Sequence, residues 1–179
     1  MKCRIRLWIG ILSLICLLIG CKESVDDYTG TLTISFITIG KGDAFLIETP
    51  EKDFYMWDTG KKEDEEQILK LLQKKGVEEL EGIFLSHGHR DHAGNLESLL
   101  KEYSVKGLYL SGRDDASYKK IDAKALAKKY GTSLIELKGG EQIDLGGATG
   151  EVWLPDKTDY KNENNNSVVM RLVYGETAC

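Results

Sequence analysis

The chain has 179 residues with 24 basic and 29 acidic side chains, which gives a formal net charge of −5 at pH 7. Its content of 41% hydrophobic and 30% charged residues is ordinary for one soluble globular domain and excludes a largely disordered chain. The negative charge excludes a general electrostatic attraction to nucleic acid or anionic lipid, so a nucleic-acid substrate would need a local basic groove.

The N-terminal segment has the pattern of an export signal. Residues 7–19 are almost all apolar and follow three basic residues, Lys2, Arg4 and Arg6. The run is shorter than the about 20 residues of a transmembrane helix and matches the apolar core of a signal peptide. It closes with Leu18-Ile19-Gly20-Cys21, which resembles the bacterial lipobox. An ordinary signal peptide or a short membrane anchor with a chance cysteine is the alternative.

The lipobox implies a domain organisation. We expect a signal peptide at residues 1–20, a lipidated Cys21 with a tether to residue 30, and a folded domain at residues 31–179. The implied partner is the cell membrane, which would hold the protein on its extracytoplasmic side through the lipid. Removal of the signal peptide leaves 21 basic and 29 acidic residues, a charge of −8. Cys179 would then be the one thiol without a lipid, so no intramolecular disulfide is expected.

The first part of the domain predicts a β-meander. Residues 31–39 alternate polar and apolar side chains, as a half-buried strand does, and residues 44–49 and 54–58 predict two further strands. Residues 63–75 place apolar side chains at helical spacing behind an acidic first turn, which predicts a surface helix that ends at Gly76.

The remainder alternates strands with helices. The predicted strands are 82–86, 106–110, 133–137, 151–154 and 168–174, and the predicted helices are 95–103 and 117–130. Strands that alternate with helices after a meander predict an α/β (α+β) domain in which a sheet is covered by helices.

All three histidines of the chain, His87, His89 and His92, lie within six residues, and Asp91 stands between the last two. Neutral imidazole offers a nitrogen lone pair to a metal, and a carboxylate adds negative charge that holds a second divalent ion. The cluster follows the predicted buried strand 82–86, so its side chains would project from a sheet edge into a cleft. A polar surface loop with a coincidental His-x-His is the alternative.

The segment Ser86-His87-Gly88-His89-Arg90-Asp91-His92-Ala93-Gly94 resembles the His-x-His-x-Asp-His signature of the metallo-β-lactamase superfamily. Residues 54–60 look like the strand and Asp-x-Gly turn that precede this signature. Residues 36–44 and 164–172 resemble segments of the hydrolase domain of ComEC-type DNA-uptake proteins. The resemblance implies a metallo-β-lactamase αββα sandwich, of which this chain holds the first sheet with its helices and part of the second sheet.

The resemblance also implies a metal-dependent hydrolase. His87 and His89 would bind one zinc ion, and Asp91 with His92 would bind a second, with one or two ions in all and manganese as the alternative metal. Asp91 is also assigned as catalytic. Zinc lowers the pKa of a bound water from 15.7 to roughly 7, so hydrolysis is the implied reaction. The ComEC-like segments indicate a nucleic acid or a small phosphodiester as substrate.

Two features depart from the family pattern. Thr38 and Lys41 stand where the subfamily has an acidic residue and a glutamine. The family also continues into a Thr-Gly-Asp strand and a further histidine loop, whereas this sequence ends at Cys179. We therefore expect an incomplete site, a longer form that is the active enzyme, and a frayed Cys179 that is a poor ligand. The alternative is a surface-anchored, catalytically inactive partial domain or binding module.

Four residues outside the motif are open to structural interpretations. Asp58 either orients a metal-binding imidazole or only forms the turn ahead of Gly60. Asp43 lies in a glycine-flanked turn between two predicted strands and is assigned a structural role. The pair Lys61-Lys62 is expected on a solvated face.

Overall fold

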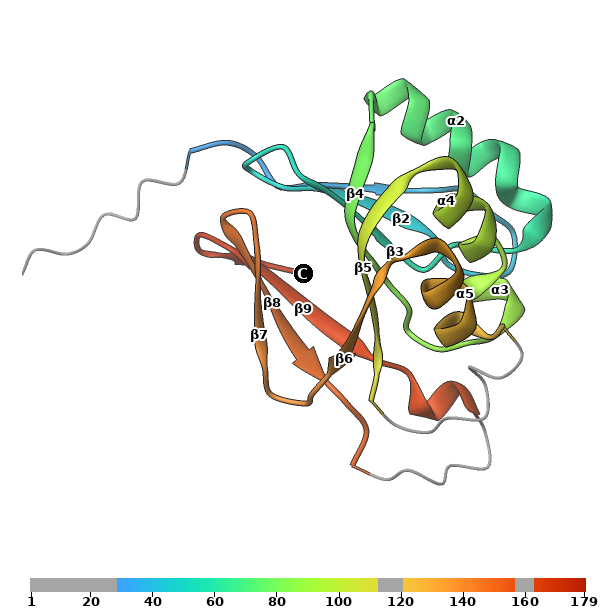
Figure 1. Cartoon of the computed structure of the whole chain (residues 1–179). Helices are drawn as coiled ribbons and strands as arrows, with labels where there is room; N and C mark the ends of the chain where they lie inside the picture. The colour runs from blue at the N-terminus through green and yellow to red at the C-terminus, as the bar shows by residue number, and fades with distance from the viewer. Residues whose placement is uncertain (1–28, 113–120, 157–162) are drawn as a thin grey trace, which may run out of the picture.

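The computed structural model describes residues 29–112, 121–156 and 163–179 (Figure 1). The expected signal peptide and the lipidated Cys21 lie outside these residues, as do residues 117–120 of the predicted helix 117–130, so these expectations stay predictions. Within the described ranges, no helix has the length and apolar character needed to cross a membrane.

The larger sheet has six strands in the order β1-β2-β3-β4-β5-β6. They are β1 (Thr33–Phe36), β2 (Phe45–Glu48), β3 (Phe54–Trp57), β4 (Glu79–Phe84), β5 (Ser104–Ser111) and β6 (Ser133–Leu137). The first three pair antiparallel, which confirms the predicted meander, and β3 to β6 pair parallel. Parallel neighbours need a crossover connection, and helices supply it between these strands.

The helices lie together on one face of the larger sheet (Figure 1). They are the 3-10 helix η1 (Lys62–Asp64) and the α-helices α2 (Glu65–Lys75), α3 (Arg90–Ala93), α4 (Leu96–Glu102) and α5 (Ala123–Tyr130). Helix α2 has acidic residues in its first turn and basic residues in its last, which complements the helix dipole. It ends where the sequence predicts, at Gly76, whose φ of 69° is the left-handed conformation that glycine adopts without strain.

The smaller sheet packs against the other face of the larger sheet (Figure 1). It is antiparallel, in the order β10-β9-β8-β7. Its strands are β7 (Gln142–Leu145), β8 (Ala148–Trp153), β9 (Val169–Tyr174) and β10 (Thr177–Ala178), and the 3-10 helix η3 (Glu163–Asn166) precedes β9. The expectation that Cys179 is frayed is wrong, because its backbone N–H and carbonyl both bond to Leu172, at 2.9 and 2.8 Å.

Two apolar cores hold the three layers together. Alternate residues of a strand face opposite sides of a sheet, so on β2 Leu46 faces the helices and Ile47 faces the smaller sheet. On β4, Ile83 likewise faces the helices and Phe84 faces the smaller sheet. This burial on both faces explains why β3 and the Gly-Ile-Phe end of β4 are continuously apolar. The helix–sheet–sheet layering confirms the predicted fold class of a helix-covered sheet with a second sheet.

Candidate metal centre

Three loops meet at one end of the larger sheet, and backbone hydrogen bonds tie them together. The amide of Gly60 donates to the Asp43 carbonyl at 2.9 Å, and that of Thr59 donates to the His92 carbonyl at 2.5 Å. The amide of Gly94 donates to the Gly60 carbonyl at 2.9 Å. The loop before β2, the turn after β3 and the loop after β4 are therefore held as one unit.

Gly42 lets the first loop lie directly on the third. A Cβ atom at this position would collide with the backbone carbonyl oxygen of Asp91, and its φ of 127° is one that L-residues rarely adopt. The close contact between the two backbones therefore requires glycine at this position.

Asp58 follows β3 and is 1% exposed. Its Oδ1 accepts from the Ser86 amide at 2.8 Å, and its Oδ2 accepts from the Ser86 hydroxyl at 2.6 Å. Oδ2 also lies 2.8 Å from His92 Nδ1. The φ of Asp58 is 52°, so the same residue forms the turn as well. Asp58 therefore makes the turn and contacts the His92 imidazole; its role in orienting a metal-binding imidazole stays a prediction.

The surroundings of Asp58 and His92 raise the pKa of both groups. Burial raises the pKa of the Asp58 carboxyl above its usual 3.8, against the opposing hydrogen bonds from His92 and Ser86. Burial lowers the pKa of His92, but the hydrogen bond and charge of Asp58, with the charges of Asp91 and Asp43, outweigh it and raise the pKa above 6.5. The position of His92 thus favours positive charge, whether a proton or a metal ion supplies it.

The three imidazole rings lie against one another. The His87 ring centroid is 4.6 Å from that of His89 and 4.1 Å from that of His92. His87 is 2% exposed, and its Nδ1 lies 3.0 Å from the Ser86 hydroxyl and 3.3 Å from the Ser167 hydroxyl. One buried imidazole in contact with two half-buried ones is unlike a fully solvated surface loop.

Two further carboxylates face His92. Asp91 Oδ2 lies 4.0 Å from His92 Nε2, and Asp43 Oδ2 lies 3.7 Å from His92 Nδ1. One ligand atom each from Asp43, Asp58 and His92 lies within 4.8 Å of the other two. Because both Asp58 oxygens already accept hydrogen bonds, we assign Asp58 to orienting His92 and Asp43 to the exposed side of the centre.

Sequence reasoning missed Asp43 and Ser167 as parts of this centre. Asp43 was assigned to a turn, and its glycine neighbours do shape that turn, but the fold also brings its carboxylate to His92. Ser167 is 80 residues from His87 in the chain, and no local pattern links the two. Ser86 stands beside the motif, where its hydroxyl could have been considered.

The donor set fits a divalent metal ion. The Nδ1 atoms of His87 and His92 are both engaged by oxygen atoms, which leaves the Nε2 atoms as the natural ligands. Imidazole nitrogens together with the carboxylate of Asp91 are the ligands that zinc takes in proteins. The residue types therefore suit zinc, and the assignment of His87, His89, Asp91 and His92 as its ligands stays a prediction.

A pocket of about 390 Å³ adjoins the centre. His87, His92 and Asp58 lie at its polar end. Apolar side chains from both sheets form the remaining wall, among them Phe45, Trp57, Val168, Met170 and Leu172. A substrate could therefore contact the histidines while an apolar part rests between the sheets.

Comparisons with known proteins agree with this architecture. The family model described as the metallo-beta-lactamase superfamily matches residues 37–166. ComE operon protein 3 of Bacillus subtilis (strain 168) is 26% identical, over 79% of this chain and 20% of that protein. The chain thus spans about one fifth of that curated relative.

Solved structures share the fold at low identity. A beta-lactamase from Chitinophaga pinensis is 17% identical with a TM-score of 0.60, over 83% of this chain and 56% of that chain. The metallo-beta-lactamase GOB-18 from Elizabethkingia meningoseptica is 20% identical with a TM-score of 0.59, over 83% and 56%. This chain spans less than two thirds of either structure. Since the family match covers well over half of the chain and the layers agree, the chain belongs to the metallo-beta-lactamase superfamily.

Proposed function

We propose that this protein is a zinc-dependent hydrolase that acts on phosphodiesters, with manganese as the alternative metal. The observation that carries the proposal is the cluster of three imidazoles, of which His87 and His92 line a pocket and have their Nδ1 atoms held by oxygen partners. Membership of a superfamily that usually binds zinc supports the choice of metal.

Each residue of the centre would have a role that follows from its position. His87, His89, Asp91 and His92 would hold the metal, which supplies Lewis-acid chemistry that activates water when bound. Asp58 keeps the His92 ring in one orientation, and Ser86 keeps Asp58 in place through two hydrogen bonds. Asp43 places negative charge 3.7 Å from Nδ1 of His92, and Asp91 places it 4.0 Å from Nε2. Asp43, which holds no metal in this scheme, would accept a proton from the reaction.

The substrate class rests on relatives and on the loop sequences. The similarity to ComE operon protein 3 and the ComEC-like segments at residues 36–44 and 164–172 support a phosphodiester over a β-lactam. The likeness to solved beta-lactamases, at 20% identity or less, supports the fold alone.

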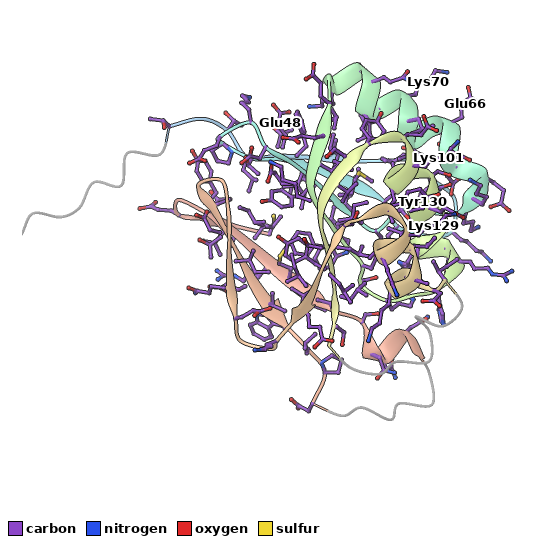
Figure 2. All side chains as sticks on the ribbon, viewed as in Figure 1. Glu48, Glu66, Lys70, Lys101, Lys129 and Tyr130 are labelled. Atoms are coloured by element: carbon purple, nitrogen blue, oxygen red, sulfur yellow. The ribbon has the colours of Figure 1, made fainter. Side chains whose placement is uncertain are left out.

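The test is hydrolysis of bis(p-nitrophenyl) phosphate by the chain after reconstitution with zinc or manganese. A complete metal site would give turnover that is removed by chelation and lost in Asp91→Ala and His87→Ala, whereas the incomplete site expected from the sequence would give little or no turnover by this chain. Glu66→Ala, which removes an exposed carboxylate on the outer side of α2, is the matched control and should keep full activity (Figure 2). Zinc binding without turnover would favour the alternative of an inactive binding module, and absence of zinc binding would reject both.

We also propose that Cys21 anchors the protein to the membrane, on the strength of its lipobox-like context. Fractionation of cells should find the protein with the membrane, and Cys21→Ala should release or misprocess it. Unchanged membrane retention of the variant, with residues 1–20 still attached, would reject lipid anchoring.

A further inference from the structure

A second hollow, of about 670 Å³, adjoins the metal centre and has a basic wall. Asp91 lines this hollow, while the next residue, His92, lines the pocket that holds the histidines. Four basic residues contribute to the wall, and we call the hollow the basic groove: Lys41, Lys61, Lys62 and Arg90.

The charge of the basic groove is opposite to that of the chain as a whole. Its wall carries four basic residues and two acidic ones, Glu63 and Asp91, although the net charge of the chain is −5. Of the four basic residues, Lys62 has an ion-pair partner among the described residues, Glu65 at 2.7 Å. A local positive site of this kind is what the sequence requires for a polyanionic substrate.

The fold holds the four basic residues close to the loop after β4, which carries the histidines and Asp91. Lys41 is next to Gly42, which packs on the Asp91 carbonyl. Lys61 and Lys62 follow Gly60, whose carbonyl accepts from the Gly94 amide. The expectation that Lys61-Lys62 only covers a solvated face is therefore too simple, because both line the groove.

Aromatic side chains lie beside the pocket that holds the histidines. Phe45 lines this pocket and stacks on Trp57, with ring centroids 6.1 Å apart and an angle of 9° between the rings; because Trp57 is 8% exposed and belongs to the core, Phe45 and Phe36 carry the accessible ring surface. Phe36 is 76% exposed and its ring lies 5.2 Å from that of Phe45. Cations that bind a backbone beside aromatic rings that stack on bases are the combination used by proteins that bind single-stranded nucleic acid.

We propose that the basic groove binds the backbone phosphates of a single-stranded nucleic acid and so places a phosphodiester beside Asp91 and His92. This rests on the proposed function, which it extends by naming the substrate class and the residues that hold it. Lys41 and Arg90 are the exposed cations nearest in sequence to Asp43 and Asp91, and they contact the phosphates that flank the cleaved bond.

The experiment measures binding of a short fluorescein-labelled single-stranded oligodeoxynucleotide by fluorescence anisotropy, with EDTA present so that no hydrolysis occurs. The test variant is Lys41→Ala/Arg90→Ala. The matched control is Lys70→Ala/Lys101→Ala, which removes the same charge from two exposed lysines on α2 and α4 (Figure 2). Melting temperatures establish that both variants fold.

We expect the test variant to raise the Kd on the order of tenfold and the control to leave it unchanged. Loss of two phosphate contacts should also lower the slope of log K against log salt by about 1.4, at about 0.7 per contact for single strands. Equal Kd values for the test variant and the unmodified chain, or no binding by the unmodified chain, would overturn the proposal that the basic groove binds nucleic acid.

Two competition arms separate nucleic-acid binding from binding of free phosphate or of a membrane. Displacement of the oligonucleotide by inorganic phosphate at equal phosphate concentration would reassign the groove to free phosphate and overturn the proposal. If the test variant loses binding to phosphatidylglycerol vesicles but retains oligonucleotide binding, the groove is reassigned to a membrane surface and the proposal is likewise overturned.

The hydrolysis assay separates the groove from the proposed function. If the chain hydrolyses bis(p-nitrophenyl) phosphate but the test variant binds DNA normally, the proposed role of the basic groove is rejected and the proposed function is supported. If the test variant binds DNA weakly and the unmodified chain shows no turnover with either metal, DNA binding by the basic groove is supported and the proposed function is rejected.

Discussion

Asp58 shows how one residue can serve the backbone and the site together. Its φ of 52° is tolerated by Asp and Asn better than by most residues, which suits the turn after β3. Its carboxylate, at 1% exposure, accepts from Ser86 and contacts His92 Nδ1. Carboxylates behind a metal-binding imidazole fix the orientation of the ring and strengthen it as a ligand.

Asp58→Asn separates these two roles, because asparagine keeps the turn and loses the charge. We expect zinc affinity to fall about 10- to 100-fold while the melting temperature changes little. Competition with a chromogenic chelator measures the affinity, and Asp144→Asn is the control, since Asp144 lies in β7 and its carboxylate accepts from the Gly147 amide in the turn that follows. Unchanged zinc affinity in Asp58→Asn would leave Asp58 with the turn role alone.

A substitution at Gly42 tests the contact between the loop before β2 and the loop after β4, which carries Asp91. In Gly42→Ala, the new methyl group meets the Asp91 carbonyl at a backbone angle that alanine avoids, so we expect a loss of about 1–3 kcal/mol of stability and weaker zinc binding. Gly40→Ala is the control, since no atom lies within 4 Å of the position that its new methyl group would take. Urea unfolding and zinc titration of both variants check the prediction. Equal effects at the two positions would show that the contact does not position Asp91.

At the scale of elements, Glu48 connects strand β2 to helix α2. Its carboxylate lies 2.9 Å from Lys52 Nζ and 3.1 Å from Lys75 Nζ, and its side chain is 16% exposed. Hydrogen bonds from these lysines hold the pKa of Glu48 below its usual 4.5. In Figure 2, Glu48 lies apart from Glu66 and Lys70, an exposed pair on α2.

Glu48→Gln should lower the free energy of unfolding by about 0.5–1 kcal/mol at pH 7. A carboxylate with a lowered folded pKa stabilises above its unfolded pKa and loses this contribution as the pH falls through the folded pKa. The difference between the variant and the unmodified chain should therefore be full at neutral pH and shrink below pH 4.5. Urea unfolding at several pH values measures it. Glu66→Gln should show almost no difference at any pH, and a difference that grows in acid for Glu48→Gln would contradict the prediction.

At the scale of the whole molecule, the outer face of the smaller sheet exposes apolar side chains. Trp153 and Val169 face each other across β8 and β9 and are 62% and 58% exposed. Their neighbour Val152, on the opposite face of β8, is 1% exposed and belongs to the core between the sheets. An exposed apolar pair on a sheet favours self-association.

Trp153→Thr/Val169→Thr should reduce self-association and binding of a hydrophobic dye. Threonine suits strands and no core contact is lost, so stability should change by about 0.5 kcal/mol or less. Val152→Thr, the control, buries an added hydroxyl and should cost roughly 1–3 kcal/mol. Light scattering and urea unfolding measure the two effects. Undiminished scattering by the double variant would assign association to another surface.

The sequence by itself located most of the strands and helices and the cluster of candidate ligands. Period-two alternation located the opening meander, and helical spacing with a closing glycine located α2, because these signals are local. The cluster at His87, His89, Asp91 and His92 was also visible as a run of metal-binding side chains. The short strands β7 and β10 and the one-turn helix α3 were missed, since segments of two to four residues carry too little periodicity.

Only the tertiary structure decided which residues surround that cluster. Asp43, Asp58 and Ser167 reach the histidines from other loops because parallel strands β3 and β4 end at the same sheet edge and Gly42 lets the first loop touch Asp91. The same convergence places Lys41 and Lys61 beside Arg90 in a groove that the net negative charge of the chain concealed. Composition averages charge over the whole chain, whereas a site depends on the few charges that folding brings together.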